Sequence, residues 1–188
     1  MEVIAAMIKA IEERRTVRKY TDQPVEEEKL REVLASARLA PTWANKQCWK
    51  LIVVRDQATR EKLAQLSNVE ASEHYPNPGA KGLAMAPVVL VACADPARSG
   101  HMYGQDYYLV DVGIVMDHIL LAATEVGLGT CFVGVFDEQG VKDLLGIPSL
   151  IRVVAMTPLG YAERWPNPRP RNDIGEMVFE GSWRQQVS

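Results

Sequence analysis

Two groups of basic residues, one near each end of the chain, are the most evident candidates for binding chemistry. They are Arg14, Arg15, Arg18 and Lys19, and Arg164, Arg169 and Arg171. A guanidinium presents a planar fork of donors that matches the oxygens of a phosphate, and the hydroxyl of Thr16 adds another donor beside the first group. The two groups therefore indicate a phosphate-binding site, and two solvated surface patches remain the alternative interpretation.

The overall charge argues against nucleic acid as the ligand. The chain carries 21 Lys and Arg residues against 24 Asp and Glu residues, for a formal net charge of -3 at pH 7. Binding to nucleic acid or to an anionic membrane depends on an excess of basic residues. Apart from Tyr20, the basic groups also lack the interleaved aromatic side chains on which bases stack. A small anionic ligand is therefore expected, with no nucleic acid and no membrane partner.

The residues that carry out chemistry in common enzymes do not form recognisable constellations. The chain has no P-loop pattern, and its glycine run at 127–134 ends a helix and enters a strand, which reverses the dinucleotide-binding order. No Ser-His-Asp, Cys-His or paired-carboxylate arrangement stands out. Neither the three histidines nor the three cysteines have metal-ligand spacing. This combination suits a bound cofactor that itself carries the reaction, with no metal.

Helical and extended patterns alternate along the chain, which predicts a layered α/β or α+β domain. Helices are expected over residues 3–13, 26–39, 59–66, 106–126 and 138–145, and strands over 49–55, 86–94, 130–135 and 152–157. The polar segments 41–47 and 67–82 are expected to be loops, and the Pro- and Arg-rich chain beyond Gly160 is expected to be a tail. With no repeat, residues 1–188 are expected to form a single domain with a C-terminal arm, 161–188.

The expected helix at 106–126 is unusual because apolar residues cover nearly all of its faces. At this length it would extend about 31 Å. A helix that is apolar all round must be buried all round, and one domain of this size can hardly surround it. A partner subunit is the simplest way to complete its burial. The most apolar part, 112–123, is too short to span a bilayer and contains Asp117 and His118, so a soluble, cytoplasmic protein is expected.

Four parts of the sequence resemble, in the same order, motifs of the nitroreductase family of flavoproteins. They are residues 13–20 (ERRTVRKY), 40–49 (APTWANKQCW), 111–113 with 122–134 (AATEVGLGTCFVG), and 159–161 with 168–171. Each motif is weak alone, but together they cover nearly the whole chain, so the chain is identified as a member of the family. The resemblance implies an α+β fold, a nitroreductase-like three-layer sandwich. Its central, mostly antiparallel sheet would be flanked by helices, with the long central helix at a homodimer interface.

The resemblance also implies that FMN is bound at the subunit interface by residues of both chains. The residues that match ligands of the phosphate and the ribityl chain are Arg14, Arg15, Thr16, Arg169 and Arg171. Arg18 matches a basic residue at the pyrimidine edge of the ring, where it would stabilise the negative charge of the reduced flavin. The strip that matches the approach from the other subunit consists of Pro41, Thr42, Trp43, Asn45 and Gln47. The segment that matches the one lying along the ring consists of Phe132, Val133 and Gly134.

Two residues of the 41–49 segment depart from the family pattern. Trp43 stands where smaller polar residues are common, and Cys48 replaces the usual proline, so a reshaped substrate pocket is expected. Without the resemblance, this segment is an ordinary helix–strand loop in which Asn45 caps a turn and Trp43 is a core or interface aromatic residue. The loop at 67–82 is expected to cover the pocket, with Tyr75 and Lys81 as lining candidates.

The activity that the resemblance implies is electron transfer from NADH or NADPH through FMN to a small oxidant, such as a nitroaromatic, a quinone or a free flavin. One pocket would serve donor and oxidant in turn, which gives a ping-pong mechanism. No side chain is assigned as catalytic acid, base or nucleophile, because the flavin would carry the chemistry. The alternatives are a specialised enzyme of the same fold, such as a reductive dehalogenase or an enone reductase, and a non-catalytic flavin-binding or sensing protein.

Overall fold

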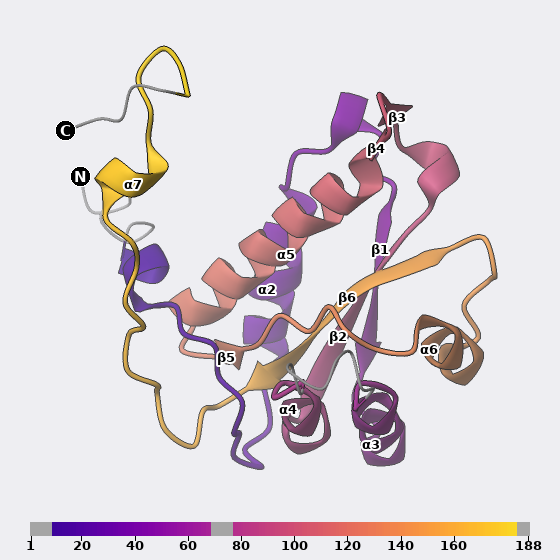
Figure 1. Ribbon diagram of the computed structural model, residues 1–188. Coiled ribbons are helices and arrows are strands. Elements are labelled where there is room, and N and C mark those ends of the chain that lie inside the picture. Colours follow the sequence, from indigo (N-terminus) through magenta and orange to yellow (C-terminus); the bar gives the residue numbers. More distant parts are fainter. Residues whose placement is uncertain (1–8, 69–76, 184–188) are drawn as a thin grey trace.

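A four-stranded antiparallel sheet forms the middle layer of the protein (Figure 1). The computed structural model describes residues 9–68 and 77–183. The strands are β1 (Trp49–Val54), β2 (Val88–Ala94), β5 (Gly129–Thr130) and β6 (Arg152–Gly160), in the order β1-β2-β6-β5. Trp49 lies opposite Ala94, and Val88 lies opposite Leu159. The antiparallel sheet that the family resemblance implied is therefore confirmed.

The central strand β2 is a continuous apolar run because both of its faces are covered. Its seven residues, VVLVACA, are all buried. Alternate side chains enter two cores: Val88, Leu90 and Ala92 on one side, and Val89, Val91 and Cys93 on the other. A strand that is buried on both sides has no alternation of apolar and polar residues. Cys93 therefore occupies the place of a small core hydrophobe.

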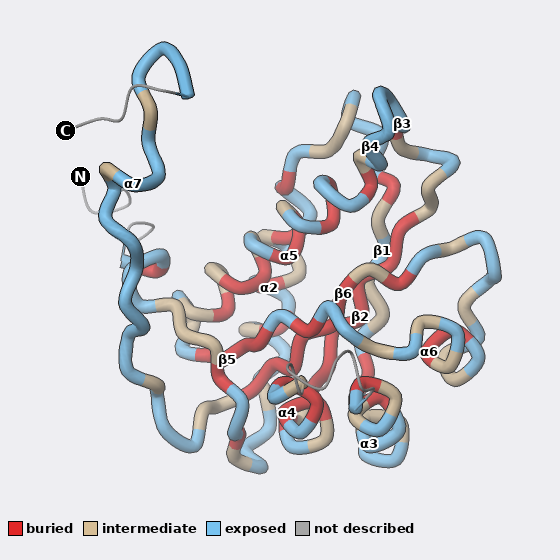
Figure 2. Tube along the Cα trace, viewed as in Figure 1, coloured by how far each residue is buried: buried red, intermediate tan, exposed pale blue. Residues whose placement is uncertain are grey.

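Helices cover both faces of the sheet and complete the three layers. On one face lie α2 (Glu27–Arg38) and α5 (Tyr107–Glu125), whose shared core includes the fully buried Val33, Met116 and Ile119. On the other face lie α3 (Gln57–Leu66), α4 (Ala80–Met85) and α6 (Glu138–Leu145). Figure 2 shows the buried residues concentrated in the sheet and on the helix sides that face it. The predicted α+β sandwich is confirmed.

The long helix α5 has one side in the core and one side at the surface of the chain. Its length and composition would allow it to cross a membrane, but 44% of its most apolar window is buried inside the protein. It packs against α2 and the sheet, which makes it a core helix. On its outer side, Leu109 and Val110 are about half exposed, at 48% and 53%.

The remaining elements of the described chain are short. They are 3-10 turns at Trp43–Asn45 and Pro96–Arg98, a hairpin of β3 (His101–Met102) and β4 (Gln105–Asp106), and α7 (Ile174–Met177). Residues 9–13 are helical and belong to the helix predicted at 3–13, whose first part lies outside the described residues. The C-terminal segment runs beside these residues and away from the sheet, and it is exposed along most of its length (Figures 1 and 2).

Two predicted elements are wrong in part. The strand predicted at 130–135 is only Gly129–Thr130, because its pairing with β6 stops where Thr130 meets Leu159. Beyond that point a single bridge joins Val133 to Met156. The loop predicted at 67–82 contains the beginning of α4 at Ala80. Its central part, 69–76, and with it the lining candidate Tyr75, lies outside the described residues.

Smaller shifts at the ends of elements have local causes. Helix α3 begins two residues earlier than predicted, because the Asp56 carboxylate accepts the N–H of Thr59 and caps the helix. Strand β6 continues to Gly160 instead of ending at Thr157, because its pairing with β2 extends through Leu159. Helix α6 has the predicted bounds, with Asp137 as its N-cap and Gly146 in the left-handed conformation after its last turn.

Candidate functional site

The segment that carries the first basic group is attached to the sheet at β5. The Val17 N–H donates a 2.8 Å hydrogen bond to the Thr130 carbonyl, and Thr16 forms a parallel bridge with Thr130. Val17 is 1% exposed and packs with Tyr20 and Ala86. The Tyr20 hydroxyl donates a 2.6 Å hydrogen bond back to the Val17 carbonyl. The backbone of this segment is therefore fixed, while the neighbouring basic side chains remain outside the core.

The C-terminal segment runs antiparallel to the same residues on their other side. The Thr21 N–H donates to the Tyr161 carbonyl at 2.9 Å, and the Glu163 N–H donates to the Lys19 carbonyl at 3.1 Å. Further along, Trp165 Nε1 donates to the Glu13 carbonyl at 3.0 Å. These hydrogen bonds bring the two basic groups together, although about 150 residues separate them in the sequence.

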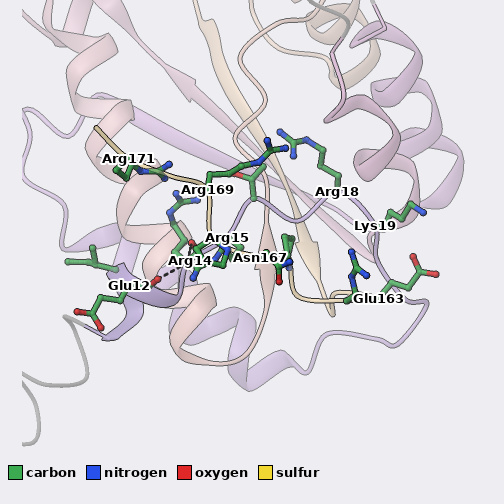
Figure 3. A pocket seen from close by; sticks show the side chains of 14 residues that line it. Glu12, Arg14, Arg15, Arg18, Lys19, Glu163, Asn167, Arg169 and Arg171 are labelled. Atoms are coloured by element: carbon green, nitrogen blue, oxygen red, sulfur yellow. Dashed lines mark hydrogen bonds between the residues drawn. The ribbon is translucent and has the colours of Figure 1, made fainter. Parts of the chain in front are cut away.

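The two segments enclose a groove with a volume of about 1110 Å³ (Figure 3). All members of both basic groups line it: Arg14, Arg15, Arg18, Lys19, Arg164, Arg169 and Arg171. Thr16 and Asn167 add polar groups to the wall, and its carboxylates are those of Glu12 and Glu163. In the view of Figure 3, Glu12, Arg14 and Arg15 lie toward one end, and Lys19 and Glu163 toward the other. The basic residues thus form one surface rather than two separate solvated patches.

The groove has a strong excess of positive charge. Seven basic residues line it against two acidic ones. Among the described ion pairs of the chain, none involves any of these seven residues. Arg15 is held by backbone groups, since one of its terminal nitrogens donates to the carbonyls of Glu12 at 2.6 Å and Arg14 at 2.9 Å. Guanidinium groups gathered in this way are suited to an anion with several oxygens, such as a phosphate.

Two buried polar atoms at this site have no hydrogen-bond partner within the described chain. They are Nε of Arg15, a residue of the groove wall, and Oγ1 of Thr130, which lies beside Thr16. Buried donors and acceptors are nearly always paired in proteins, and an unpaired one is costly. An unpaired guanidinium donor in the wall of a basic groove fits an oxygen-rich anionic ligand. The residues present therefore suit the phosphate group that the family resemblance implies.

The loop at 41–47 lies elsewhere on the chain and contributes nothing to the wall of this groove. Three of its residues adopt positive φ angles that residues with a side chain rarely have: Ala44 at 45°, Asn45 at 52° and Gln47 at 49°. Asn45 and Gln47 are exposed and border a second, more open groove beside β1. Pro41 is exposed as well, whereas Thr42 and Trp43 are half-buried. The loop therefore presents several side chains to the surroundings in an unusual backbone conformation.

The segment Phe132–Val133–Gly134 follows β5 and has mixed exposure. Phe132 is 49% exposed, while Val133 is 2% exposed in the core beneath α4 and α6. The N–H of Val133 donates to the Met156 carbonyl at 2.9 Å, so this backbone donor is already used within the sheet region of the chain. Gly134 is exposed. None of the three residues lines the basic groove.

The structure of the single chain thus brings one part of the predicted site together and leaves two parts away from it. Arg14, Arg15, Thr16, Arg18 and the pair Arg169 and Arg171 line the same groove. The 41–47 strip and the 132–134 segment do not share a wall with them. Lys81, the other lining candidate, is exposed on α4 and is also absent from the groove wall.

Sequence reasoning did not assign two residues that the structure places at these sites. Asn167 lines the groove, and no local pattern in the tail distinguishes it. Asp111 is a buried carboxylate whose Oδ1 accepts the Trp43 N–H at 2.7 Å. A lone carboxylate in the apolar stretch YYLVDVGIVM of α5 was a usable signal for the second residue.

The fold and the site together define a class of protein. It is an α+β sandwich in which segments near both ends of the chain form a groove suited to a phosphate. The sequence model of the family described as "Nitroreductase family" matches residues 11–161 of this chain. The chain belongs to the nitroreductase family.

Individual relatives agree with this assignment over most of the chain. A protein of Archaeoglobus fulgidus named putative NADH dehydrogenase/NAD(P)H nitroreductase is 34% identical over 158 residues, which cover 82% of this chain and 84% of the relative. A Bacillus subtilis protein named FMN reductase [NAD(P)H] is 28% identical, covering 88% of this chain and 69% of the relative. The crystal structure of a nitroreductase family protein from Clostridium novyi NT is similar with a TM-score of 0.77 and 32% identity, covering 96% of both chains.

Proposed function

We propose that the protein is an FMN-dependent NAD(P)H oxidoreductase. The observation that carries the proposal is the groove in which seven basic residues from both ends of the chain converge. Family membership supports a flavin as the ligand of this groove, and the names of the Archaeoglobus and Bacillus relatives support NAD(P)H as electron donor. The phosphate is the part of FMN that such a groove fits best.

Different residues of the groove would bind different parts of FMN. Arg14, Arg15, Arg169 and Arg171 would bind the phosphate through charge-assisted hydrogen bonds, and the Thr16 hydroxyl would add a neutral one. Arg18 would hold a positive charge near the pyrimidine edge of the ring. When bound, FMN supplies the redox chemistry, accepting electrons from NAD(P)H and passing them to a small oxidant such as a nitroaromatic or a quinone. The contribution of Arg18 is a fixed charge placed in advance, which lowers the cost of reducing the ring.

We further propose that two protomers complete the site in a homodimer. Within one protomer, Asn45 and Gln47 do not share a wall with the basic groove. The outer side of α5 exposes Leu109 and Val110, and an apolar helix surface of this kind favours a partner. In the proposed dimer α5 packs against the partner, and the 41–47 loop of one protomer reaches the flavin held by the other. Neither chain alone would then form a complete flavin site.

The cofactor is tested by identifying the flavin that the purified protein releases on denaturation. We expect about one FMN per chain. Release of FAD, or an apo-protein that does not bind added FMN, would contradict the proposal. The measurement needs only absorbance, chromatography of the released flavin and mass spectrometry.

Turnover is tested by stopped-flow reduction of the bound flavin with NADH and NADPH separately, followed by a panel of oxidants. Rapid bleaching of the flavin absorbance with either donor supports an oxidoreductase. A flavin that the donors leave oxidised would instead favour a non-catalytic flavin-binding protein. The oxidant that restores the absorbance fastest identifies the substrate class and separates a general reductase from a specialised enzyme of the same fold.

A further inference from the structure

Asp111 is a buried carboxylate that accepts hydrogen bonds from three residues, two in the 41–49 segment and one in the turn at Ser99. It is 2% exposed, on the core side of α5. Its Oδ1 accepts the backbone N–H of Trp43 at 2.7 Å. Its Oδ2 accepts the hydroxyl of Ser99 at 3.2 Å and the thiol of Cys48 at 3.3 Å. One side chain thus connects the 41–47 loop, the residue before β1 and the turn before the β3–β4 hairpin.

No cation balances this carboxylate in the part of the chain that the structure describes. Burial of a carboxylate without a cation is unfavourable, and it is tolerated only where several donors replace water. Burial and, after it, the hydrogen bond and charge of Asp111 raise the pKa of the Cys48 thiol to about 11. The thiol therefore keeps its proton at neutral pH and remains a donor to Asp111. An apolar residue at position 111 would leave all three donors without a partner.

The loop that Asp111 holds has a conformation that needs support. Ala44, Asn45 and Gln47 have positive φ angles, which are unfavourable for residues with a side chain. Inside the loop, the Gln47 N–H donates to Thr42 Oγ1 at 3.0 Å. At its base the Trp43 indole fills the space beside Gly100, where a Cβ atom would lie 2.5 Å from Trp43 Cε2. Ser99 and Gly100 thus fix the loop together, one through Asp111 and the other through the indole of Trp43.

We infer that Asp111 is a positioning residue that holds the 41–47 loop in the conformation that presents Asn45 and Gln47 to the flavin. The inference rests on the proposed function, because it takes the flavin as the ligand of this loop. Asp111 itself does not contact the flavin. It acts through the backbone of Trp43 and through the Ser99 turn, from inside the protomer to which the loop belongs.

Asp111→Asn tests the inference with a nearly unchanged shape. The amide keeps an oxygen for the Trp43 N–H, but it turns an NH₂ group toward the Ser99 and Cys48 donors. We expect the Kd for FMN, measured by quenching of flavin fluorescence on titration of apo-protein, to rise about tenfold. In the apo-protein, before FMN is added, we expect the amide NMR signals of residues 42–48 and 99–100 to shift while those of α3 and α6 stay in place.

Ile119→Ala provides the matched control. Ile119 is fully buried on the same side of α5, two turns beyond Asp111, so its truncation lowers stability without removing a hydrogen bond to the loop. It should lower the melting temperature and leave the FMN Kd within about twofold. If Asp111→Asn behaved in the same way, with unchanged FMN affinity and no selective NMR shifts, the inference would be overturned while the proposed function stood.

Two further results keep the test decisive. If Asp111→Asn failed to fold, Ser99→Ala would replace it, because it removes one donor only; the same signals should shift, with a rise of about threefold in Kd. Unchanged signals and affinity in that variant would overturn the inference. A wild-type protein that bound no FMN would contradict the proposed function instead, and the NMR shifts of the apo-variants would then decide the positioning role alone.

Discussion

Gly129 lies so close to Val17 that a Cβ atom on Gly129 would be 2.7 Å from Val17 Cγ2 and 2.8 Å from Val17 Cβ. These distances are far shorter than the contact distance of two carbon atoms. The glycine therefore sets how near the basic segment 14–19 lies to β5. The glycine run at 127–134, which superficially resembles a nucleotide fingerprint, has this packing role at Gly129, while Gly127 ends α5 with a φ of 78°.

Gly129→Ala should displace the basic segment and weaken the site. Overpacking at a buried contact costs about 1–3 kcal/mol of stability, and the shift of Arg14 and Arg18 should reduce FMN affinity as well. Urea unfolding and FMN titration measure the two effects on the same sample. A variant with wild-type stability and affinity would show that the segment moves away from β5 at no cost.

Arg171→Ala should weaken the binding of FMN much more than the binding of riboflavin. A hydrogen bond to a charged group contributes roughly 1.5–3 kcal/mol, so the loss of FMN affinity should be on the order of 10–100-fold. Riboflavin lacks the phosphate and should lose little. Arg31→Ala, an exposed arginine on α2 outside the groove, is the control. Equal losses for both flavins would show that Arg171 does not contact the phosphate.

Arg18→Ala should make the bound flavin harder to reduce. A cation near the pyrimidine edge stabilises the negative charge of the reduced ring, and an interaction of about 1.5–3 kcal/mol corresponds to roughly 30–60 mV for a two-electron couple. The midpoint potential should fall by that amount in a potentiometric titration. A potential that rose or stayed constant would remove the role assigned to Arg18.

Glu138 should stabilise the protein at neutral pH and lose this effect in acid. Its partial burial alone would raise the pKa of its carboxyl, but hydrogen bonds from Arg152, the Val153 N–H and Lys142 outweigh burial and lower the pKa to about 2. The ordinary value is 4.5, so the contribution is complete above pH 4.5 and declines as the pH falls toward 2. Glu138→Gln should cost about 1–3 kcal/mol at pH 7, because the buried Lys142 loses its ion-pair partner and keeps the Ser149 carbonyl as an acceptor.

The measurement for Glu138 is urea unfolding of wild type and Glu138→Gln from pH 7 down to pH 3.5. The difference in unfolding free energy should narrow below pH 4.5. Glu32→Gln, an exposed carboxylate on α2, is the control. A difference that stayed constant with pH would mean that Glu138 acts through its shape and not through its charge.

Val110→Glu should separate the proposed dimer and release FMN. Val110 is 53% exposed on the outer side of α5, so the protomer tolerates a charge there, whereas a dimer interface does not. Light scattering coupled to size exclusion, with flavin absorbance recorded across the peak, should show a monomer of about 21 kDa without FMN. Lys62→Glu, on the exposed side of α3, is the control and should leave the mass of the dimer and the amount of bound FMN unchanged. A flavin-loaded wild-type monomer would contradict the dimer and the shared site.

The sequence predicted elements whose signals are local. Helix α6 has the predicted bounds because Asp137 and Gly146 mark its ends, and β2 is evident as an apolar run. The first residues of α4 fall in the predicted loop 67–82, because this segment contains two prolines, two glycines, among them Gly82, and several polar residues. The structure explains this glycine: a Cβ at position 82 would lie 3.2 Å from Tyr20 Cε2, so Gly82 allows α4 to approach the basic segment.

In the candidate site, too, the features with a local signal could be predicted and those that depend on distant contacts could not. The basic residues could be predicted because the chemistry by which an arginine binds phosphate is recognisable from the sequence alone, whatever its position in the fold. The pairing of residues 19–21 with 161–163 could not be predicted, because it depends on backbone hydrogen bonds between distant segments. The donors of Asp111 were equally hidden, since Trp43 and Cys48 precede Asp111 by more than 60 residues and Ser99 lies in a separate turn.

The joining of the two ends of the chain also has a consequence for biosynthesis. The ribosome releases Arg14 and Arg18 early, whereas Arg169 and Arg171 follow only after every strand of the sheet has been made. A nascent chain that stalls or terminates before residue 169 would contain the whole sheet and lack part of the groove. Binding of one phosphate by both basic groups therefore requires a chain that has been translated at least as far as Arg171.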